Sequence, residues 1–536
     1  MGVPQASRRG SIGSVAAMEI RAAAVVGLGT MGAGIAEVFG RAGIDVTAIE
    51  VDTDALARGV GILDASLARA VSRGKLTEAD RDEIRGRIRP TTAFSDAARV
   101  DLAIEVVPEQ MAIKRQIFAQ LDRVCGPEAI LATNTSSLSV TSIAAATANP
   151  DRVVGMHFFN PAPVMRLVEV VSTVRTAAGL ADQIGDLARR LGKTPVQVSD
   201  RAGFVANALL LPYLNHAVRL LETGYATRED IDLAATAGLG LPMGPLALLD
   251  LIGLDTSLSI LEALHGEFGG TRYVPAPLLR RLVSAGRTGR KAGRGIHDYA
   301  AGGTEGNAGG VPAGGYGGSS PRADRRAAGP GGGAAGTEAA PPSTVTLIGS
   351  GGSAEAELAS AAATAGINVT RNPAHPSDLV VIAAAPDQRV LPAALEAGRA
   401  EQAVGLHLAA SGLAEVISTR VTSPAAAAAG KALAARLGLQ AVRAPDRPGF
   451  LAGALLYPHL ADAARMVQDG YATAADVDTA MTLGCGYPLG PFQLLDKAGP
   501  VAVLDGLRAM HAAYGDPAFA PPPLLAEHAA APGSAG

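Results

Sequence analysis

The 536-residue sequence has no tryptophan and only two cysteines, Cys125 and Cys485, which lie far apart in the chain. Two distant cysteines do not form a disulfide framework, so the composition favours a reducing, cytoplasmic location. Aromatic residues make up 4% of the chain and charged residues 18%, with both signs mixed and a formal net charge of -4. Because a nucleic-acid-binding surface needs a basic face, this charge balance argues against nucleic acid as a partner.

Long apolar runs are also missing. No stretch of about 18 apolar residues is free of charged or turn residues, so we expect no membrane-spanning helix and no membrane partner. Residues 1–20 hold two arginines but no long apolar segment behind them, which does not fit a secretory signal. Hydrophobic residues still make up 48% of the chain. That is enough for sizeable cores, and a chain of this length predicts two to four domains.

The chain contains an internal duplication on either side of a low-complexity segment. Residues 301–343 are mostly Gly, Ala, Pro and Ser, which predicts a linker rather than a core. Residues 201–250 and 447–496 align without a gap at an offset of 246 (447 − 201), with GF, GYAT, GP and LLD in register. An alignment of this length indicates that a whole domain has been copied.

Each copied segment has helical periodicity, whereas the residues ahead of it alternate between short apolar strands and helices. The fold class is therefore an α/β Rossmann-like doubly wound sheet plus an all-α domain, duplicated in tandem. The second sheet domain should be reduced, because 130 residues separate the first glycine from the histidine in the first half (157 − 27) and 58 in the second (407 − 349). The expected parts are a disordered tail (1–20), a dinucleotide-binding domain (21–200), a helical domain (201–300), the linker (301–343), a degenerate sheet domain (344–446), a second helical domain (447–516) and a second disordered tail (517–536).

The stretch "GLGTMG" predicts a dinucleotide site, with its glycines at Gly27, Gly29 and Gly32. It follows an apolar strand and opens a helix, and Glu50 ends the next strand, which is the context that makes this motif specific. The glycines allow a tight turn, close approach of a pyrophosphate and packing of the helix on the strand. Because a carboxylate repels a 2′-phosphate, Glu50 favours NAD over NADP. The second copy reads "GSGGSA" and has Arg371 where an acid is needed, so we expect it to bind no dinucleotide.

A candidate catalytic pair lies in "VGMHFFNPAPVMRLVEVV". His157 ends a strand at the edge of the sheet where ligands bind in such folds, and Ser136 in "NTSSL" ends the strand before it. Glu169 follows after a turn and could face His157. A histidine with a carboxylate at one ring nitrogen and a substrate hydroxyl at the other is a general base.

Residues 22–300 resemble the 3-hydroxyacyl-CoA dehydrogenase family in "GLGTMGAGIAEVF", "ATNTSSLSVTSIA", "GMHFFNPAPVMRLVEVV", "GFVANALLLPYLNHAVRLLE" and "GRKAGRGIHDY". The tandem arrangement resembles longer bacterial members, some of which act on 3-hydroxyadipyl-CoA in the breakdown of aromatic acids such as phenylacetate. The resemblance implies NAD as cofactor, no metal, and reversible oxidation of (S)-3-hydroxyacyl-CoA, with 3-hydroxybutyryl-CoA or 3-hydroxyadipyl-CoA as substrate.

The resemblance also assigns roles by motif. His157 and Glu169 would form the base, Ser136 would bind the reacting oxygen and Asn207 the thioester side. Contacts to the cofactor would come from Gly27, Gly29, Thr30, Met31, Gly32, Glu50, Glu109, Lys114, Asn134 and Asn160. Ser66 and Arg73 match positions that contact CoA.

The second half has lost most of these groups. His407 and Glu415 are separated by seven residues, against eleven for His157 and Glu169, and Gly453 replaces Asn207 at the offset of 246. We therefore expect His407 to have a structural role. Helical domains pair between subunits in the short members that this chain resembles. The chain could accordingly form a homodimer, or its second helical domain could replace the partner as an intramolecular pseudo-dimer.

Two other functions fit parts of the pattern. A sugar-acid dehydrogenase of the L-gulonate type shares the fold and a similar histidine–glutamate pair. A non-catalytic NAD-binding or crystallin-like structural protein would also keep the glycine loop. The complete set of Ser136, His157, Glu169 and Asn207 favours the enzyme.

Overall fold

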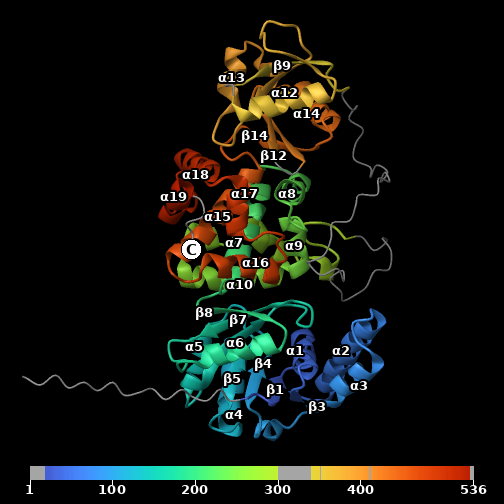
Figure 1. The fold of residues 1–536 in the computed structure, drawn as a ribbon, viewed down its shortest axis with the longest axis vertical. Coiled ribbons are helices and arrows are strands. Elements are labelled where there is room, and N and C mark those ends of the chain that lie inside the picture. Colours follow the sequence, from blue (N-terminus) through green and yellow to red (C-terminus); the bar gives the residue numbers. More distant parts are fainter. Residues whose placement is uncertain (1–18, 300–339, 350–351, 410–411, 532–536) are drawn as a thin grey trace, which may run out of the picture. The chain divides into compact units, whose positions relative to one another are not determined.

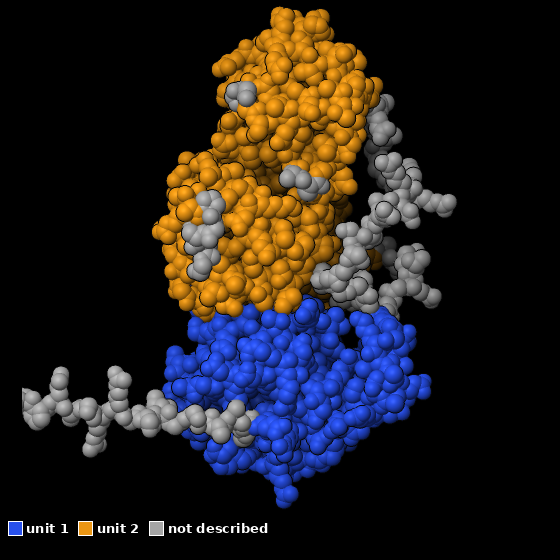
Figure 2. Space-filling view, in the orientation of Figure 1, with its two compact units in different colours: residues 1–204 blue, residues 205–536 orange. Residues whose placement is uncertain are grey.

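The computed structural model describes residues 19–299, 340–349, 352–409 and 412–531. The chain divides into two compact units, residues 1–204 and 205–536, which Figure 2 shows in different colours and which are described separately here. Residues 1–18 of the expected tail (1–20) and residues 301–339 of the expected linker (301–343) lie outside the described residues. Among the helices of the described part, none is both long and apolar enough to cross a membrane.

The first unit contains an eight-stranded sheet in the order β3-β2-β1-β4-β5-β6-β7-β8. Neighbouring strands are parallel except β6 and β7, which form an antiparallel hairpin. Strands such as β1, β4 and β5 are continuous apolar runs because helices cover both faces of such a sheet. The strands are β1 (Ala22–Val26), β2 (Asp45–Ile49), β3 (Ile88–Thr91), β4 (Leu102–Glu105), β5 (Ile130–Thr133), β6 (Val153–Phe158), β7 (Leu167–Ser172) and β8 (Thr194–Ser199).

Six α-helices pack around the described sheet of this unit, and several begin at recognisable caps (Figure 1). The side chain of Asp52 accepts a hydrogen bond from Ala55 N at the start of α2. Thr77 and Asp80 form a reciprocal capping box at the start of α3. The helices are α1 (Thr30–Arg41), α2 (Thr53–Ser72), α3 (Glu78–Gly86), α4 (Met111–Val124), α5 (Val140–Ala144) and α6 (Leu180–Arg190). The predicted doubly wound fold is confirmed.

The second unit combines both copies of the helical domain in one bundle. The green helices α7–α11 and the red helices α15–α19 lie against each other in Figure 1, with α7 packed on α15 and α16. The helices are α7 (Ala206–Glu222), α8 (Arg228–Leu233), α9 (Pro245–Ile252), α10 (Leu254–Phe268), α11 (Pro277–Ser284), α15 (Ala452–Gln468), α16 (Ala474–Cys485), α17 (Pro491–Ala498), α18 (Pro500–Tyr514) and α19 (Pro523–Ala530).

The two helical copies keep the same capping hydrogen bonds. Asp232 accepts the backbone N–H groups of Leu246 and Ala247. Asp478, at the offset of 246 (478 − 232), accepts those of Phe492 and Gln493. The duplication therefore extends from the sequence to individual contacts.

The second unit also holds the smaller sheet, with six strands in the order β10-β9-β11-β12-β13-β14. Six strands against eight confirm the predicted reduction. The strands are β9 (Thr344–Ile348), β10 (Asn368–Thr370), β11 (Leu379–Ala383), β12 (Ala403–Ala409), β13 (Leu413–Ser418) and β14 (Gln440–Pro445), and the helices are α12 (Ser353–Thr364), α13 (Val390–Glu396) and α14 (Pro424–Arg436).

The expectation of a disordered tail from residue 517 is wrong for the described residues, which end at 531. Helix α19 packs on α15 and α18. Leu525 is buried, and His528 Nε2 lies 2.7 Å from Asp496 Oδ1. The proline-rich composition was misleading because proline is well tolerated in the first turn of a helix, where Pro523 lies.

Candidate active site

The glycine loop between β1 and α1 has the geometry of a dinucleotide site. Gly27 has a φ of 97°, a region that side chains rarely adopt. A Cβ on Gly32 would lie 1.8 Å from the carbonyl oxygen of Gly27, whereas one on Gly29 would meet nothing within 4 Å. The first and third glycines are therefore needed for the turn and for packing, and the middle one leaves room beside the helix N-terminus for a pyrophosphate. Thr30 and Met31 begin α1.

Glu50 lies directly behind this loop at the end of β2. Its Oε1 accepts a hydrogen bond from Leu28 N at 2.7 Å, and its Oε2 accepts one from Val51 N at 3.0 Å. A carboxylate has about four acceptor sites, so it keeps capacity for ribose hydroxyls. The sequence reasoning missed Gly59 of α2, where a Cβ would lie 2.4 Å from Leu28 Cβ. Only glycine allows α2 to pack this closely on the loop.

His157 and Glu169 face each other across the hairpin of β6 and β7. They are directly paired in the antiparallel register, and His157 Nδ1 lies 2.7 Å from Glu169 Oε2. The two residues are 6% and 0% exposed. The histidine ring also contacts the rings of Phe159 and Phe204, at centroid distances of 4.5 and 5.6 Å. The structure thus brings this pair together in a water-poor, apolar surrounding.

Glu109 organises the loop that carries Ser136. Its Oε1 accepts hydrogen bonds from Thr135 Oγ1 at 2.7 Å, Ser136 N at 2.9 Å and Ser137 N at 3.0 Å. Burial alone would raise the pKa of Glu109, but the Lys114 ammonium and these hydrogen bonds lower it to about 2. The carboxylate is thus ionised at any pH at which the protein would work, and it fixes the "NTSS" turn.

Lys114, an expected cofactor contact, lies in the core of the first unit. It is 1% exposed. Its Nζ lies 2.8 Å from Glu105 Oε1, 3.2 Å from Val107 O and 3.3 Å from Glu109 Oε2. The contacts to Glu105 and Val107 are hydrogen bonds, and the contact to Glu109 is an ion pair. Lys114 therefore supports Glu109 from within the core. Glu105, which the sequence reasoning missed, is the buried end of β4.

The remaining predicted residues are distributed over both units. Asn134 Oδ1 accepts a hydrogen bond from Phe158 N at 2.7 Å, which connects the ends of β5 and β6. Asn160 is exposed in the loop after β6, Ser66 is half-buried on α2, and Arg73 is exposed at its end. Asn207 lies in the first turn of α7, in the second unit.

The second sheet domain has a charged side chain beside Gly349, the first glycine of its motif. Gly32 is the third residue of α1, and the third residue of α12 is Glu355. Its Oε1 lies 2.9 Å from Nε of Arg371, which follows β10 as Glu50 follows β2. A Cβ on Gly349 would lie 2.6 Å from Glu355 Oε2, so this side chain fills the space beside the turn. An acid on the helix and a base after the strand thus replace the glycine on the helix and the acid after the strand that the first sheet domain has.

The second histidine–glutamate pair keeps its register but not its contact. His407 is still directly opposite Glu415. The approach is now by Nε2, at 4.0 Å from Glu415 Oε2, while His407 Nδ1 lies 3.1 Å from Ala384 O. Glu415 Oε1 instead accepts Leu451 N at 2.7 Å and Ala452 N at 2.9 Å, at the start of α15. The carboxylate here anchors a helix.

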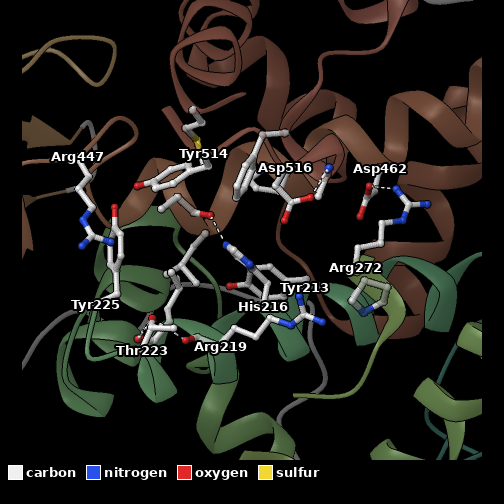
Figure 3. Close-up of a pocket in the computed structure, with 18 residues that line it drawn as sticks. Tyr213, His216, Arg219, Thr223, Tyr225, Arg272, Arg447, Asp462, Tyr514 and Asp516 are labelled. Carbon is white, nitrogen blue, oxygen red and sulfur yellow. Dashed lines mark hydrogen bonds and ion pairs between the residues drawn. The ribbon is translucent and has the colours of Figure 1, made fainter. Parts of the chain in front are cut away.

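A cavity of about 280 Å³ lies between the helical copies, and Figure 3 shows His216 from α7 reaching the backbone of α15. Several of the polar groups around it have partners. His216 Nε2 lies 3.0 Å from Ala454 O, Arg219 donates to the carbonyls of Thr271 and Val274, and Arg272 pairs with Asp462. None of the predicted site residues lines this cavity, so it is a gap in the seam between the copies.

The doubly wound sheet, the open glycine turn and the acid behind it place the first unit among the NAD-dependent oxidoreductases. Comparison with known proteins narrows the class. Residues 22–201 match the family described as "3-hydroxyacyl-CoA dehydrogenase, NAD binding domain". Residues 203–299 and 449–534 both match the family's "C-terminal domain". The chain belongs to the 3-hydroxyacyl-CoA dehydrogenase family and is an NAD-dependent enzyme of that family.

Individual relatives cover either half or nearly all of the chain. A 3-hydroxybutyryl-CoA dehydrogenase of Mycobacterium tuberculosis H37Rv is 50% identical over 282 residues, which cover 52% of this chain and 99% of the relative. A 3-hydroxyadipyl-CoA dehydrogenase of Escherichia coli K12 is 34% identical over 522 residues, 96% of this chain and 98% of the relative. A crystal structure titled 3-hydroxybutyryl-CoA dehydrogenase from Escherichia coli K12 has a TM-score of 0.76 at 32% identity and covers 96% and 99% of the two chains.

Proposed function

We propose that this enzyme oxidises (S)-3-hydroxybutyryl-CoA or (S)-3-hydroxyadipyl-CoA to the 3-oxo thioester, reversibly, with His157 as the general base. The contact of 2.7 Å between His157 Nδ1 and Glu169 Oε2 carries this proposal. When Nδ1–H donates to the carboxylate, Nε2 has no proton and can accept one from a substrate hydroxyl. A bound NAD supplies the nicotinamide that accepts the C3 hydride.

The surroundings of the pair suit this role. Glu169 is fully buried, so its negative charge is poorly screened and stabilises the imidazolium that forms when His157 takes the proton. We assign Ser136, on the turn fixed by Glu109, to the reacting oxygen, and Asn207 to the thioester side. Asn134 and Asn160 remain proposed contacts on the cofactor side, and Ser66 and Arg73 proposed contacts to CoA.

The substrate assignment has two supports that point to different acyl groups. The catalytic half is 50% identical to a 3-hydroxybutyryl-CoA dehydrogenase. The tandem architecture matches a 3-hydroxyadipyl-CoA dehydrogenase along nearly the whole chain. Comparison of kcat/KM for the two thioesters decides between them. The chain has only two cysteines, far apart in the sequence, which supports the proposal of a reducing, cytoplasmic location.

Removal of the charge of Glu50 should weaken the preference for NAD. Glu50→Gln keeps an oxygen acceptor for Leu28 N but loses the carboxylate that accepts two ribose hydroxyls and repels a 2′-phosphate. We expect kcat/KM for NAD to fall about tenfold, equivalent to about 1.4 kcal/mol, while that for NADP rises or stays constant. Steady-state rates with both cofactors measure the ratio. A wild-type enzyme that prefers NADP would contradict the role of Glu50.

The second helical copy stands in for a partner subunit. Tyr213 of α7 and His459 of α15 are equivalent positions (459 − 213 = 246), and their rings lie 5.1 Å apart. Contact between equivalent residues is the signature of a two-fold interface at its axis. The hydroxyl of Tyr225 also donates to Phe450 O across the same seam. These contacts support the proposal that the helical copies form a pseudo-dimer within one chain.

The full-length chain should accordingly be a monomer of 53.9 kDa. Sedimentation velocity at micromolar concentration measures this directly. A fragment of residues 18–300 exposes the seam, so we expect it to self-associate or to unfold at a lower temperature. A fully active, monomeric fragment would show that the second copy does not replace a partner.

A further inference from the structure

The loop between β6 and β7, residues 159–166, begins two residues after His157. Phe159 lies with its ring 4.5 Å from the histidine ring, and Asn160 is the exposed residue next to it. The loop also connects the strand of His157 to the strand of Glu169. Its conformation therefore sets the wall of the site around the histidine ring.

A buried lysine donates hydrogen bonds to the backbone of this loop. Lys193, at the start of β8, is 8% exposed, and its Nζ donates to Ala162 O at 2.6 Å and to Met165 O at 2.7 Å. Helix α1 supports the same segment, because a Cβ on Gly34 would lie 3.0 Å from Pro163 Cδ. The middle of the loop is thus clamped between a helix of the dinucleotide motif and an ammonium group.

Burial of the ammonium group of Lys193 is energetically unfavourable. Burial and, to a smaller extent, the positive charge of Arg41 lower the pKa of Lys193 to about 8, against a smaller opposing effect of Glu37. A buried cation is destabilising unless its hydrogen bonds are satisfied. A leucine or methionine would serve packing alone at lower cost.

The second sheet domain has a shorter connection at this place. There the hairpin strands β12 and β13 are joined by residues 410–412 alone, and the position of Lys193 is Leu439 (439 − 193 = 246). Other contacts of the sheet survive the duplication. Asp446 accepts Val390 N and Leu391 N as Asp200 accepts Val140 N and Thr141 N.

A second conserved contact supports the same comparison. Thr176 donates to Val153 O at 2.8 Å, and its copy Thr422 donates to Ala403 O at 2.9 Å. Contacts that build the sheet were kept in both copies, whereas the lysine is replaced and the loop is shorter in the second copy. The second sheet folds without an equivalent of Lys193. This comparison therefore indicates that the lysine serves the loop rather than the general stability of the fold.

We infer that Lys193 is a positioning residue, which holds the loop of residues 159–166 so that Phe159 fixes the ring of His157 and Asn160 faces the site. The inference rests on the proposed function of His157 as the base. It assigns to Lys193 no contact with substrate or cofactor. Its effect passes through two backbone carbonyls.

The test compares Lys193→Met with a matched control in the full-length chain. Arg152→Met also removes a buried cation, 9% exposed, that donates to backbone carbonyls, those of Gly126 and Ala129. We expect K193M to lower kcat about 10- to 100-fold, since small displacements of a reacting group have effects of that size, with KM for NAD within twofold. R152M should lower the melting temperature similarly but leave kcat within twofold. Lys193→Arg, which can donate to both carbonyls, should restore most of the rate.

Hydrogen exchange of the peptide that spans residues 159–166 makes the test independent of turnover. The inference predicts exchange at least tenfold faster in K193M and unchanged in R152M. Unchanged exchange, or faster exchange with a wild-type kcat, would overturn it. If the wild type oxidises no 3-hydroxyacyl-CoA, the proposed function fails, and exchange alone still decides whether Lys193 holds the loop. If K193M does not fold, K193Q carries the same comparison.

Discussion

Replacement of His157 by glutamine is expected to lower kcat for 3-hydroxyacyl-CoA by about 100- to 10,000-fold, the usual contribution of a positioned general base. Glutamine keeps a side-chain amide near Glu169 but cannot take a proton from the hydroxyl. The glycine loop and Glu50 are separate from this pair, so binding of NAD should stay within twofold. Steady-state rates and calorimetric titration with NAD measure the two effects separately.

The chain contains its own control for this prediction. His407→Gln changes the equivalent histidine in the second sheet, where Glu415 is engaged with Leu451 N and Ala452 N. We expect H407Q to keep kcat within twofold. Equal losses in H157Q and H407Q would point to two cooperating sites. A fully active H157Q would remove the base from the proposed mechanism.

The second large effect is a loss of folding stability at acidic pH that arises at the interface between the helical copies. His459 is 3% exposed and lies between the rings of Tyr213 and Tyr487, at 5.1 and 5.7 Å. Burial lowers the pKa of His459 from 6.5 to about 4. The folded state thus keeps this ring neutral, while an unfolded chain would protonate it at its ordinary pKa.

The sign follows from proton uptake. Above pH 6.5 the ring is neutral in both states and contributes no pH dependence. Between pH 6.5 and 4 the unfolded state binds the proton first, so the free energy of unfolding falls as the pH falls, and below about 4 the trend ends. A shift from 6.5 to about 4 corresponds to about 3 kcal/mol. His216, which lines the seam cavity and also has its pKa lowered to about 4 by burial, acts in the same direction.

Buried carboxylates oppose this trend. Burial raises the pKa values of Asp462 and Glu415, so the folded state binds their protons first and gains stability on acidification. The contribution of His459 to the pH dependence must therefore be measured as the difference between the wild type and a variant that lacks this histidine. Relative to His459→Phe, the wild type should lose about 3 kcal/mol between pH 7 and pH 4 in urea unfolding followed by circular dichroism.

An exposed histidine of the same bundle provides the control. His265 lies on the solvent face of α10. His265→Phe should therefore give a pH profile parallel to that of the wild type. Parallel profiles for the wild type and H459F would contradict burial as the source of the acid sensitivity.

Sequence reasoning found those features that repeat along the chain or sit in a defined local context. The glycine turn with Glu50, the duplication and the reduced second sheet needed no side-chain contacts to be recognised. The family assignment rests on the same stretches. His157 and Glu169 were predicted as a pair because one strand end and one turn bring them together.

Spacing was a poor guide to the second pair. Seven residues between His407 and Glu415, against eleven in the first half, suggested that they had separated. The hairpin lost an even number of residues, four, and an even loss leaves the two side chains on the same face and opposite each other. What changed was the ring nitrogen and the partner of the carboxylate, which only coordinates reveal.

Buried polar networks were the other limit. Lys114 in "VPEQMAIK" was assigned as a cofactor contact by resemblance, because nothing local shows that Glu105 and Glu109 meet its ammonium in the core. The role of Lys193 is hidden for the same reason, since its partners are backbone carbonyls 28 and 31 residues away. Such contacts depend on the register of strands that are distant in sequence.

The central claim is that the first half of this chain oxidises 3-hydroxyacyl thioesters with NAD. Initial rates of NADH formation with (S)-3-hydroxybutyryl-CoA, (S)-3-hydroxyadipyl-CoA and L-gulonate, each at matched concentrations, test it most directly. The account predicts turnover of at least one thioester, loss of that turnover in H157Q, and no turnover of the sugar acid. NAD-linked oxidation of L-gulonate without activity on either thioester would contradict it.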